Sequence, residues 1–473
     1  MRFRALVAAA LVAAVAFVGA ATMMFFGYER GYNAGQTQVE GSSTLRGPLA
    51  GVDLRSIFPR PSDEHLVALA FRQVERVYYK PVGAQTLLSG EHDGIVHLLR
   101  GAGVNATLPA VRATGDQSTD LQSSDAQLAY AQSHYARRLK GNGNLAIAQA
   151  AQRGILSSVG DPYTVYLSPQ EIQSLDESLN GGNFGGIGVY ILPLRDGQIL
   201  LQPIDGLPAA RAGVKPGDIV VAVDGTRVAR MPIDKVERLI RGEKGTPVSI
   251  TTHPYKQRKQ RTYHIVRDII HVPTVRAKME NGYDYIRLSD FGETSASEVK
   301  RALLFGKAHD AKGYILDLRD NGGGLLNAAI EISSYFIPHG TIVSTIDRHG
   351  NTSVSPALGD AIGGLRPLVV LVNKYTASAS EITSGALQDY RLGTLVGTKT
   401  FGKGVVQSIY PMPDQSALKI TTARYLTPLG RSIQHRGIEP DILVNQNPDP
   451  GLIDTPRDKQ LAAAKARLAA FPR

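Results

Sequence analysis

Short apolar runs alternate with helical runs beyond Pro273, and this alternation restricts the fold more than any other feature of the sequence. Tyr314 to Leu318 precedes a helical run from Leu325 to Phe336, and Leu368 to Val372 precedes another from Ala379 to Tyr390. Strands that alternate with helices usually form one sheet with crossover helices packed on it. The carboxyl-terminal part of the chain is therefore predicted to be an α/β layer.

A different pattern occupies the middle of the chain, from Asn183 to Asp268, where apolar residues recur with the period of strands. Gly-Asp and Asp-Gly turns separate these runs, and Pro208 to Ala212 and Pro232 to Ile240 are typical of two helices. The pattern predicts a compact β-rich domain, with strands at Val189 to Leu192, Ile199 to Ile204, Ile219 to Val223, Val248 to Thr252 and Thr262 to Val266.

A small helical layer is predicted before this domain. An amphipathic helix is expected after Ser62, and helical character returns between Asp125 and Ser157. The stretch from Gly101 to Gln127 is rich in Thr, Ser, Gln, Asp and Gly, which indicates a loop or insertion rather than a packed element.

A chain of 473 residues exceeds what one hydrophobic core usually organises, so several domains are expected. The polar, Gly-rich sequence from Glu29 to Pro59 is typical of a tether. The expected divisions are an anchor or signal segment at 1–28, the tether at 29–60, the helical region at 61–170, the β-rich domain at 171–266, the α/β core at 267–447 and a tail with a short helix at 448–473.

The amino terminus predicts export. Arg2 and Arg4 precede an uncharged run from Ala5 to Gly27, and a bilayer is spanned by roughly 20 apolar residues. Cleavage at Gly19 to Ala21 would leave further apolar residues on the mature chain, which favours an uncleaved anchor. Because positive residues stay inside, we expect a cell-envelope protein. Its body would lie in the periplasm or extracytoplasmic space, anchored in the cytoplasmic membrane, or be secreted if the segment is cleaved.

Composition excludes several kinds of site. The chain has no cysteine, so it has no disulfide, thiolate zinc site or lipidated cysteine anchor. The formal charge is +10, but the basic residues are scattered. Their densest group, at Lys256, Arg258, Lys259 and Arg261, is more typical of a solvated hairpin than of a nucleic-acid groove. Nucleic acid is therefore not expected as a partner.

Ser378 follows a buried strand and a turn, at the expected start of a helix. Unpaired N–H groups and the positive dipole end at such a position can hold a developing oxyanion, which suits a nucleophile. Serine is also among the commonest helix caps. From this stretch alone, the cap is the simpler interpretation.

Lys403 lies between two glycines, Gly402 and Gly404, and close to Phe401, Val405 and Val406. A lysine acts as a base only when it is neutral, which requires its pKa to fall from ~10.4 to near 7 or 8. Burial could achieve this, although a solvated lysine in a surface turn is the plain alternative.

The two stretches together, Thr376 to Ile382 and Thr400 to Gln407, closely resemble the carboxyl-terminal processing peptidases. In that family the nucleophile is the first serine of Ser-Ala-Ser-Glu and the base is the lysine of Phe-Gly-Lys-Gly. The resemblance therefore implies these roles for Ser378 and Lys403, and it implies that Gln407 helps to position the lysine.

The segment from Tyr314 to Leu325 resembles another part of the family signature and implies one oxyanion donor at Gly323, with a second at Ala379. Gly322 stands where proline is frequent in the family, which leaves the choice of glycine open. A phosphate-binding loop is the alternative, but no Lys-Ser/Thr follows the glycines.

The sequences Phe184 to Val189 and Ala212 to Val220 resemble a PDZ domain. Such a domain adds a peptide strand to its sheet edge and holds the terminal carboxylate with backbone N–H groups. We expect the peptide tail at Phe184, Gly185, Gly186, Ile187 and Gly188. In the family, an arginine at the position of Arg267 senses a loaded PDZ domain; a surface ion pair is the alternative.

The resemblance covers roughly Ser62 to Val444 and implies a ClpP/crotonase-like α/β peptidase core, a PDZ domain and a helical layer. It implies an exported serine endopeptidase that cleaves proteins near their carboxyl termini, without metal or organic cofactor. The expected partners are protein substrates bound by their carboxyl termini and the membrane, while an adaptor protein and a homodimer or higher oligomer are left open. The alternative is a catalytically idle, membrane-tethered PDZ scaffold.

Overall fold

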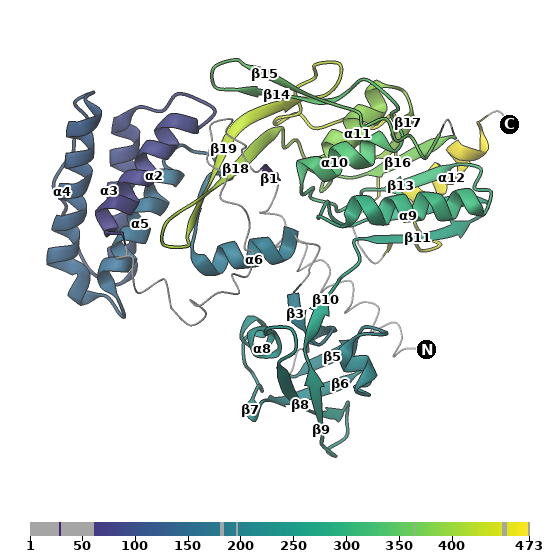
Figure 1. Ribbon diagram of the computed structural model, residues 1–473, viewed down its shortest axis with the longest axis horizontal. Helices are drawn as coiled ribbons and strands as arrows, with labels where there is room; N and C mark the ends of the chain where they lie inside the picture. The colour runs from purple at the N-terminus through teal and green to yellow at the C-terminus, as the bar shows by residue number, and fades with distance from the viewer. Residues whose placement is uncertain are drawn as a thin grey trace, which may run out of the picture.

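The structure is a computed structural model that describes residues 28–29, 61–179, 184–194, 197–364, 366–446 and 452–471. Figure 1 shows three parts: a group of helices, a β-rich domain, and an α/β core that is linked to both. The expected anchor or signal segment, 1–28, and the expected tether, 29–60, lie outside the described residues except for Tyr28 and Glu29. No helix within the described residues is long and apolar enough to cross a membrane.

The helical layer packs around glycines where α3 crosses α5. A Cβ built on Gly154 of α5 would lie 2.0 Å from the carbonyl oxygen of Gly90 on α3, so only glycine permits this approach. The hydroxyl of Ser62 accepts the His65 N–H and begins the first helix. The elements are α2 (Asp63–Val77), α3 (Ala84–Gly101), α4 (Gln117–Tyr135), the 3₁₀ turn Ala136–Arg138 and α5 (Gly143–Ser157), followed by β2 (Val165–Leu167) and α6 (Pro169–Leu179).

The expectation of a loop as far as Gln127 is wrong for its second half, because α4 already begins at Gln117. The Asp116 carboxylate accepts an N–H of the first turn and caps the helix. Its buried side includes polar residues: the Ser124 hydroxyl donates to the buried Glu91 carboxylate of α3 at 2.5 Å. A helix that buries polar side chains lacks an apolar stripe, so hydrophobic periodicity cannot detect it.

The β-rich domain is an antiparallel sheet in the order β4-β5-β6-β8-β9, with β7 paired to β6. β4 is a terminal strand of this sheet, and α8 packs beside it. A separate pair, β3 with β10, joins the beginning and the end of the domain. The elements are β3 (Phe184–Gly186), β4 (Val189–Pro193), β5 (Ile199–Pro203), α7 (Pro208–Arg211), β6 (Asp218–Val223), β7 (Thr226–Arg227), α8 (Ile233–Ile240), β8 (Pro247–Pro254), β9 (Arg261–Val266) and β10 (Asp268–Ile270).

The α/β core contains the sheet β11-β12-β13-β16-β17-β20, which is parallel from β12 onward. Successive residues of β16 belong to different hydrophobic clusters: Val370 packs with the α9–α11 side and Val369 packs with α12. Helices therefore cover both faces. The elements are β11 (Val275–Glu280), β12 (Tyr283–Leu288), α9 (Ser295–Ala308), β13 (Tyr314–Asp317), α10 (Leu326–Ser334), β16 (Leu368–Val372), α11 (Ala379–Asp389), β17 (Gly393–Gly397), β20 (Ile442–Leu443) and α12 (Lys459–Ala469).

A second sheet, β1-β18-β19-β14-β15 with β2 paired to β19, connects the core to the helical layer. The β18–β19 hairpin reaches from the core toward the helices (Figure 1). Val406 of β18 packs in the cluster of the core, whereas Leu418 of β19 packs in the cluster of the helical layer. These strands are β1 (Tyr28–Glu29), β14 (Thr341–Asp347), β15 (Thr352–Pro356), β18 (Val405–Pro411) and β19 (Ala417–Leu426).

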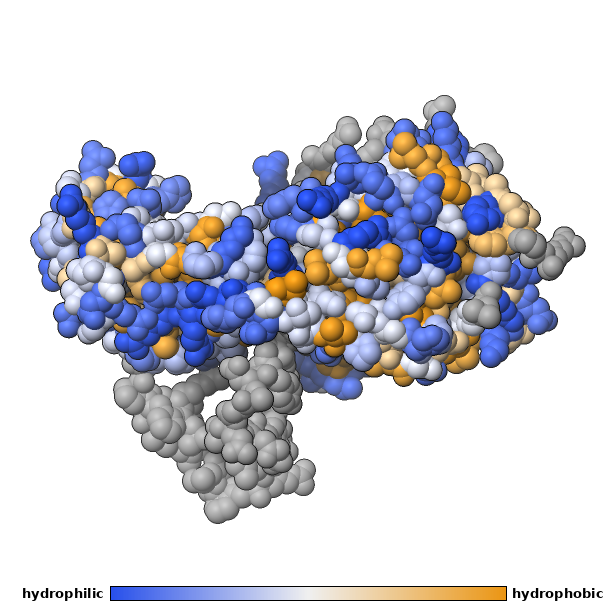
Figure 2. Space-filling model, turned by 90° about the horizontal axis from the view of Figure 1, so that it is seen from above, coloured by the Kyte–Doolittle hydropathy of each residue, from blue (hydrophilic) through white to orange (hydrophobic). Residues whose placement is uncertain are grey.

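Seen from above, the exposed apolar residues lie in several separate groups with hydrophilic residues between them (Figure 2). Phe401, two residues before Lys403, is among the exposed large hydrophobic residues, with 54% of its surface accessible. It is thus outside the buried surroundings that the sequence suggested for this stretch.

Candidate active site

Ser378 occupies a strained turn between β16 and α11. Its φ is 55° and its ψ is −118°, in a region that residues other than glycine rarely adopt. Such a conformation costs about 1–3 kcal/mol and is retained only where the surroundings enforce it. The residue is 2% exposed and immediately precedes the first residue of α11.

The Glu381 carboxylate joins the two stretches that the sequence singled out. One oxygen accepts the N–H of Ser378 at 3.0 Å and the N–H of Lys403 at 2.9 Å. The other accepts the N–H of Gly402 at 2.8 Å and the hydroxyl of Thr400 at 2.5 Å. Four donors on one buried carboxylate hold the turn at Ser378, here called the serine turn, against the loop 400–403, here called the lysine loop.

Lys403 is buried, with 1% of its surface exposed. Burial lowers its pKa well below the ordinary value, and the positive charge of Lys419 lowers it further, whereas Asp161 and Glu381 act in the opposite direction. Its Nζ lies 4.4 Å from the centre of the Tyr163 ring. In these surroundings the amine loses its proton far more easily than a solvated lysine would, as a general base requires.

Tyr425 of β19 contacts both residues. Its hydroxyl donates to the backbone carbonyl of Lys403. Burial raises the pKa of Tyr425 well above the usual range against the lowering effect of the nearby Ser378 side chain, so this phenol stays protonated. It acts here as a neutral hydrogen-bonding group.

Gln407 lies on β18 and is fully buried. Its Nε2 donates at 3.3 Å to the Val405 carbonyl and at 3.4 Å to the Thr421 hydroxyl. Its Oε1 has no hydrogen-bond partner within the described residues. A buried amide oxygen without a donor is costly, and it can accept a hydrogen bond from an ammonium group.

Gly323 lies directly against the serine turn. Its φ is 106°, and a Cβ at this position would lie 2.8 Å from the Ser378 Cβ and 2.8 Å from the Ala379 nitrogen. Only glycine fits there. Its N–H, however, donates to the Asn321 side chain at 2.8 Å, so it does not point to an oxyanion in this arrangement.

The second expected donor, Ala379, is the first residue of α11, where helix N–H groups lack intrahelical acceptors. No acceptor among the described residues binds its N–H. The Asn321 carbonyl accepts the Ala377 N–H at 3.0 Å and the Ser380 hydroxyl at 3.0 Å. These two hydrogen bonds attach the loop 320–324, here called the glycine loop, to the serine turn. Of the two expected oxyanion donors, only that of Ala379 is available as the structure stands.

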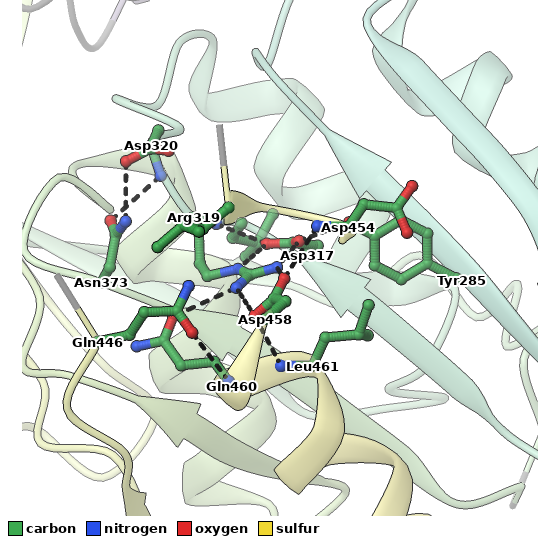
Figure 3. A network of polar contacts seen from close by, with 12 residues as sticks. Tyr285, Asp317, Arg319, Asp320, Asn373, Gln446, Asp454, Asp458, Gln460 and Leu461 are labelled. Atoms are coloured by element: carbon green, nitrogen blue, oxygen red, sulfur yellow. Dashed lines mark hydrogen bonds and ion pairs between the residues drawn. The ribbon is translucent and has the colours of Figure 1, made fainter. Parts of the chain in front are cut away.

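A buried charge network lies around Arg319, which directly precedes the glycine loop 320–324 (Figure 3). Arg319 is 1% exposed and binds the Asp317 carboxylate, with 2.6 Å between Nη2 and Oδ2. It also binds Asp458 at the start of α12, with 2.8 Å between Nη1 and Oδ1. Next to it, Asp320 and Asn373 pair through two hydrogen bonds. The ends of β13 and β16 are therefore tied together and to the carboxyl-terminal helix.

The expected peptide-binding residues lie at the start of the β-rich domain. Phe184, Gly185 and Gly186 form β3, and Ile187 and Gly188 follow before β4. Gly188 has a positive φ of 74°, which a turn at this point requires.

Arg267 is 9% exposed and points into the same domain rather than to the active site. Its guanidinium donates to the carbonyls of Leu239 and Ile240 at the end of α8, at 3.1 and 2.8 Å. It also donates to the Pro247 carbonyl at 2.9 Å and to the Thr246 hydroxyl at 3.1 Å. The residue is thus no surface ion pair: it caps α8 and holds the strand connection next to β10.

Sequence reasoning missed three residues of this site: Glu381, Tyr425 and Tyr163. Glu381 stands three positions after Ser378, which is the spacing of a capping box and could have drawn attention to it. Tyr163 lies in the stretch 161–164, which also resembles the family, but the resemblance assigns it no role. Tyr425 carries no local signal, and both residues reach Lys403 from other parts of the chain. Within the described residues, no group of three or more acidic, His or Cys side chains could hold a metal ion.

Comparisons with known proteins identify two modules. The family model described as "Peptidase family S41" matches residues 282–444, which contain Ser378, Lys403 and the glycine loop. The model described as "PDZ domain" matches residues 200–252, within the β-rich domain.

Two proteases are similar over more than half of this chain. A carboxy-terminal-processing protease of Bartonella bacilliformis is 39% identical over 306 residues, which are 63% of this chain and 70% of that protein. A carboxyl-terminal-processing protease of Picosynechococcus is 40% identical over 299 residues, 62% of this chain and 72% of that protein. Among solved structures, the photosystem II D1 C-terminal processing protease is 26% identical, with a TM-score of 0.46 over 85% of this chain and 97% of that chain. With this arrangement and these relatives, the chain belongs to the carboxyl-terminal-processing proteases, a family of PDZ-containing serine peptidases.

Proposed function

We propose that Ser378 is the nucleophile and Lys403 the general base of this carboxyl-terminal-processing serine peptidase. The observation that carries the proposal is the Glu381 carboxylate, which binds the backbone N–H groups of both residues at once. The strained turn at Ser378 and the depressed pKa of Lys403 support the same assignment. Membership of a peptidase family favours this function over an idle PDZ scaffold.

In the proposed first step, the Ser378 Oγ attacks the carbonyl carbon of the scissile bond while the neutral Lys403 Nζ takes the hydroxyl proton. The resulting ammonium then gives a proton to the leaving amine, and an acyl-enzyme forms on Ser378. A water molecule that transfers its proton to Lys403 hydrolyses this ester. The free Oε1 of Gln407 is suited to accept from the ammonium and so to position it.

The oxyanion is proposed to bind the N–H of Ala379 first. The N–H of Gly323 can join only after it leaves the Asn321 side chain, which accepts it at 2.8 Å. Substrate binding would thus complete the oxyanion hole by shifting the glycine loop.

The PDZ domain is proposed to take the substrate tail as an added strand on the outer edge of β4, next to α8. The carboxylate would meet the N–H groups between Gly185 and Gly188. Arg267 holds both the end of α8 and the connection to β10, so we propose that it transmits tail binding to the core.

We further propose that the amino-terminal run at 5–27 anchors the enzyme in the cytoplasmic membrane, with the body in the periplasm or extracytoplasmic space. The support is the sequence itself: two arginines precede an uncharged run of bilayer length. An adaptor and a homodimer or higher oligomer are compatible with this arrangement.

The test compares cleavage of an unfolded protein such as casein by the enzyme and by its Ser378→Ala and Lys403→Ala variants. Both variants are expected to lose at least about 10³-fold in kcat/KM, since each removes a group that takes part in bond making. Ser297→Ala and Lys399→Ala are matched controls, because both side chains lie on the exposed surface. Cleavage by the two dyad variants at the rate of the controls would refute the dyad.

A further inference from the structure

A short turn that follows the helical layer, 161–164, reaches into the surroundings of Lys403. The Asp161 carboxylate accepts the N–H of Tyr163 at 3.0 Å and the hydroxyl of Thr164 at 2.8 Å. It also accepts the hydroxyl of Thr421 on β19. One carboxylate therefore shapes the turn and fastens it to the strand beside the dyad.

This turn is in contact with the lysine itself. The Tyr163 ring lies 4.4 Å from the Nζ of Lys403, so the position of the ring is part of the wall around the amine. The Thr164 hydroxyl accepts the N–H of Thr421 at 3.1 Å, which adds a second attachment to β19. The first and the last residue of the turn, Asp161 and Thr164, are thus both bonded to Thr421.

A second lysine, Lys419, lies on the same face of the β18–β19 hairpin. It is 4% exposed and lies two residues before Thr421, so both side chains point to one side of β19. Thr421 is directly opposite Gln407 in the sheet, which places Gln407 on that face too. Lys419 and Gln407, the residue proposed to position the base, therefore lie on one face of the hairpin, and Asp161 binds Thr421 on that face.

The charges act on Lys403 in opposite senses. The positive charge of Lys419 lowers the pKa of Lys403, and the negative charge of Asp161 raises it. Burial lowers the pKa of Lys419 itself to about 8, and Asp161 opposes this shift, so Lys419 is charged at neutral pH. The other titratable groups around Lys403 are Glu381 from α11, Tyr425 from β19 and Tyr163.

We propose that Asp161 and Lys419 are positioning residues of the peptidase: together they hold the wall around Lys403 and set the pH range in which it works as a base. This inference rests on the proposed Ser378–Lys403 dyad. Asp161 acts through the Tyr163 turn and Lys419 through its charge.

The test is the pH dependence of kcat/KM for casein cleavage by the full chain, measured below pH 8, for the enzyme and for Asp161→Asn and Lys419→Met. The acid limb of this profile reports the pKa of the free enzyme's base. Asp161→Asn removes a negative charge, so the limb is expected to move to lower pH. Lys419→Met removes a positive charge, so the limb is expected to move to higher pH. Each shift should be about one pH unit, and the double variant should lie between them.

Thr421→Val is the matched control for structural disturbance, because it removes the hydrogen bonds to Asp161 and from Gln407 without changing any charge. Its rate should fall while its acid limb stays in place. Glu381, whose pKa is raised to about 7, titrates in the same range, but neither substitution removes a partner of its carboxylate. If Lys419→Met does not fold, as judged by thermal unfolding, Lys419→Gln replaces it.

Unshifted limbs, or shifts in the same direction for both variants, would overturn the inference. That outcome differs from failure of the dyad, which would appear as full activity of Ser378→Ala or Lys403→Ala. Opposite shifts in enzymes that remain dyad-dependent are the expected result.

Discussion

At the scale of single residues, the site depends on neighbouring groups that hold Ser378 and Lys403 in place. Ser378 alone is compatible with a helix cap and Lys403 alone with a solvated lysine. The structure places Ser378 at the N-cap of α11, in a capping box with Glu381, and buries Ser378 and Lys403. Because both backbone N–H groups bind the Glu381 carboxylate and Lys403 is buried, Lys403 is not a solvated lysine. Burial raises the pKa of Glu381 to about 7, while its four hydrogen bonds favour the ionised form.

Glu381→Gln is predicted to lower kcat more than it raises KM. The amide offers one oxygen in place of two and turns its NH₂ group toward N–H donors, so the serine turn and the lysine loop lose their common anchor. Losing two such charge-assisted bonds should cost at least about tenfold in kcat. Steady-state kinetics check this against Glu331→Gln, whose exposed carboxylate accepts from Tyr335 at the end of its own helix. Equal kinetics for the two variants would contradict the anchoring role.

At the scale of elements, α4 shows how a polar segment becomes a packed helix. Asp116 caps it, and Ser124 satisfies one oxygen of the buried Glu91, whereas the other oxygen of Glu91 has no partner within the described residues. Burial raises the pKa of Glu91 to about 8. The helical layer therefore carries a carboxyl group that is protonated in the folded state at neutral pH.

The pH dependence of folding follows from this shift. Below the unfolded pKa, Glu91 is protonated in both states and costs nothing; between this value and about 8, only the unfolded state ionises. Stability is thus lost as pH rises through this window. Glu91→Gln is predicted to remove the loss and to stabilise the protein at pH 8.5 by up to about 5 kcal/mol, with little effect at pH 4.5. Urea unfolding at both pH values measures this; an equal effect at both would contradict a buried, protonated Glu91.

At the scale of the whole molecule, the start of the carboxyl-terminal helix α12 meets the segment that precedes the glycine loop. The carboxylate of Asp458 binds Arg319 across 139 residues of sequence. Burial alone would raise the pKa of Asp458, but the bonds from Arg319 hold it below the usual value. The carboxyl-terminal helix is therefore part of the peptidase core and not an appended tail.

Asp458→Asn is predicted to destabilise the enzyme by about 2 kcal/mol, because the amide turns a donor toward the buried guanidinium in place of a carboxylate oxygen. Asparagine still caps α12, so the loss reports the charge network and not the cap. Asp454→Asn is the control: its ion pair with Lys278 is exposed and should contribute less than about 1 kcal/mol. Chemical unfolding of both variants gives the comparison, and equal midpoints would argue against the network.

Most strands and helices of the PDZ domain and the core follow from hydrophobic periodicity and turn residues, since these patterns depend on local sequence. The polar helix α4 does not, because its buried side chains are satisfied by partners on another helix. The candidate nucleophile, base and glycine loop were also predictable, since each lies in a short motif. The contacts of Tyr163 and Tyr425 with Lys403 were not predictable, because they depend on how separate segments pack.

The sequence by itself determined the family and the order of the two matched modules, and it predicted Ser378 and Lys403 as the candidate dyad, because short motifs carry that information. Only the tertiary structure decided that Glu381 joins the two halves of the dyad, that Asn321 occupies the N–H of Gly323, and that Arg267 caps a helix of the PDZ domain. The reason is physical: hydrogen bonding and burial depend on which distant groups come within about 3 Å of each other, and no local pattern encodes that distance.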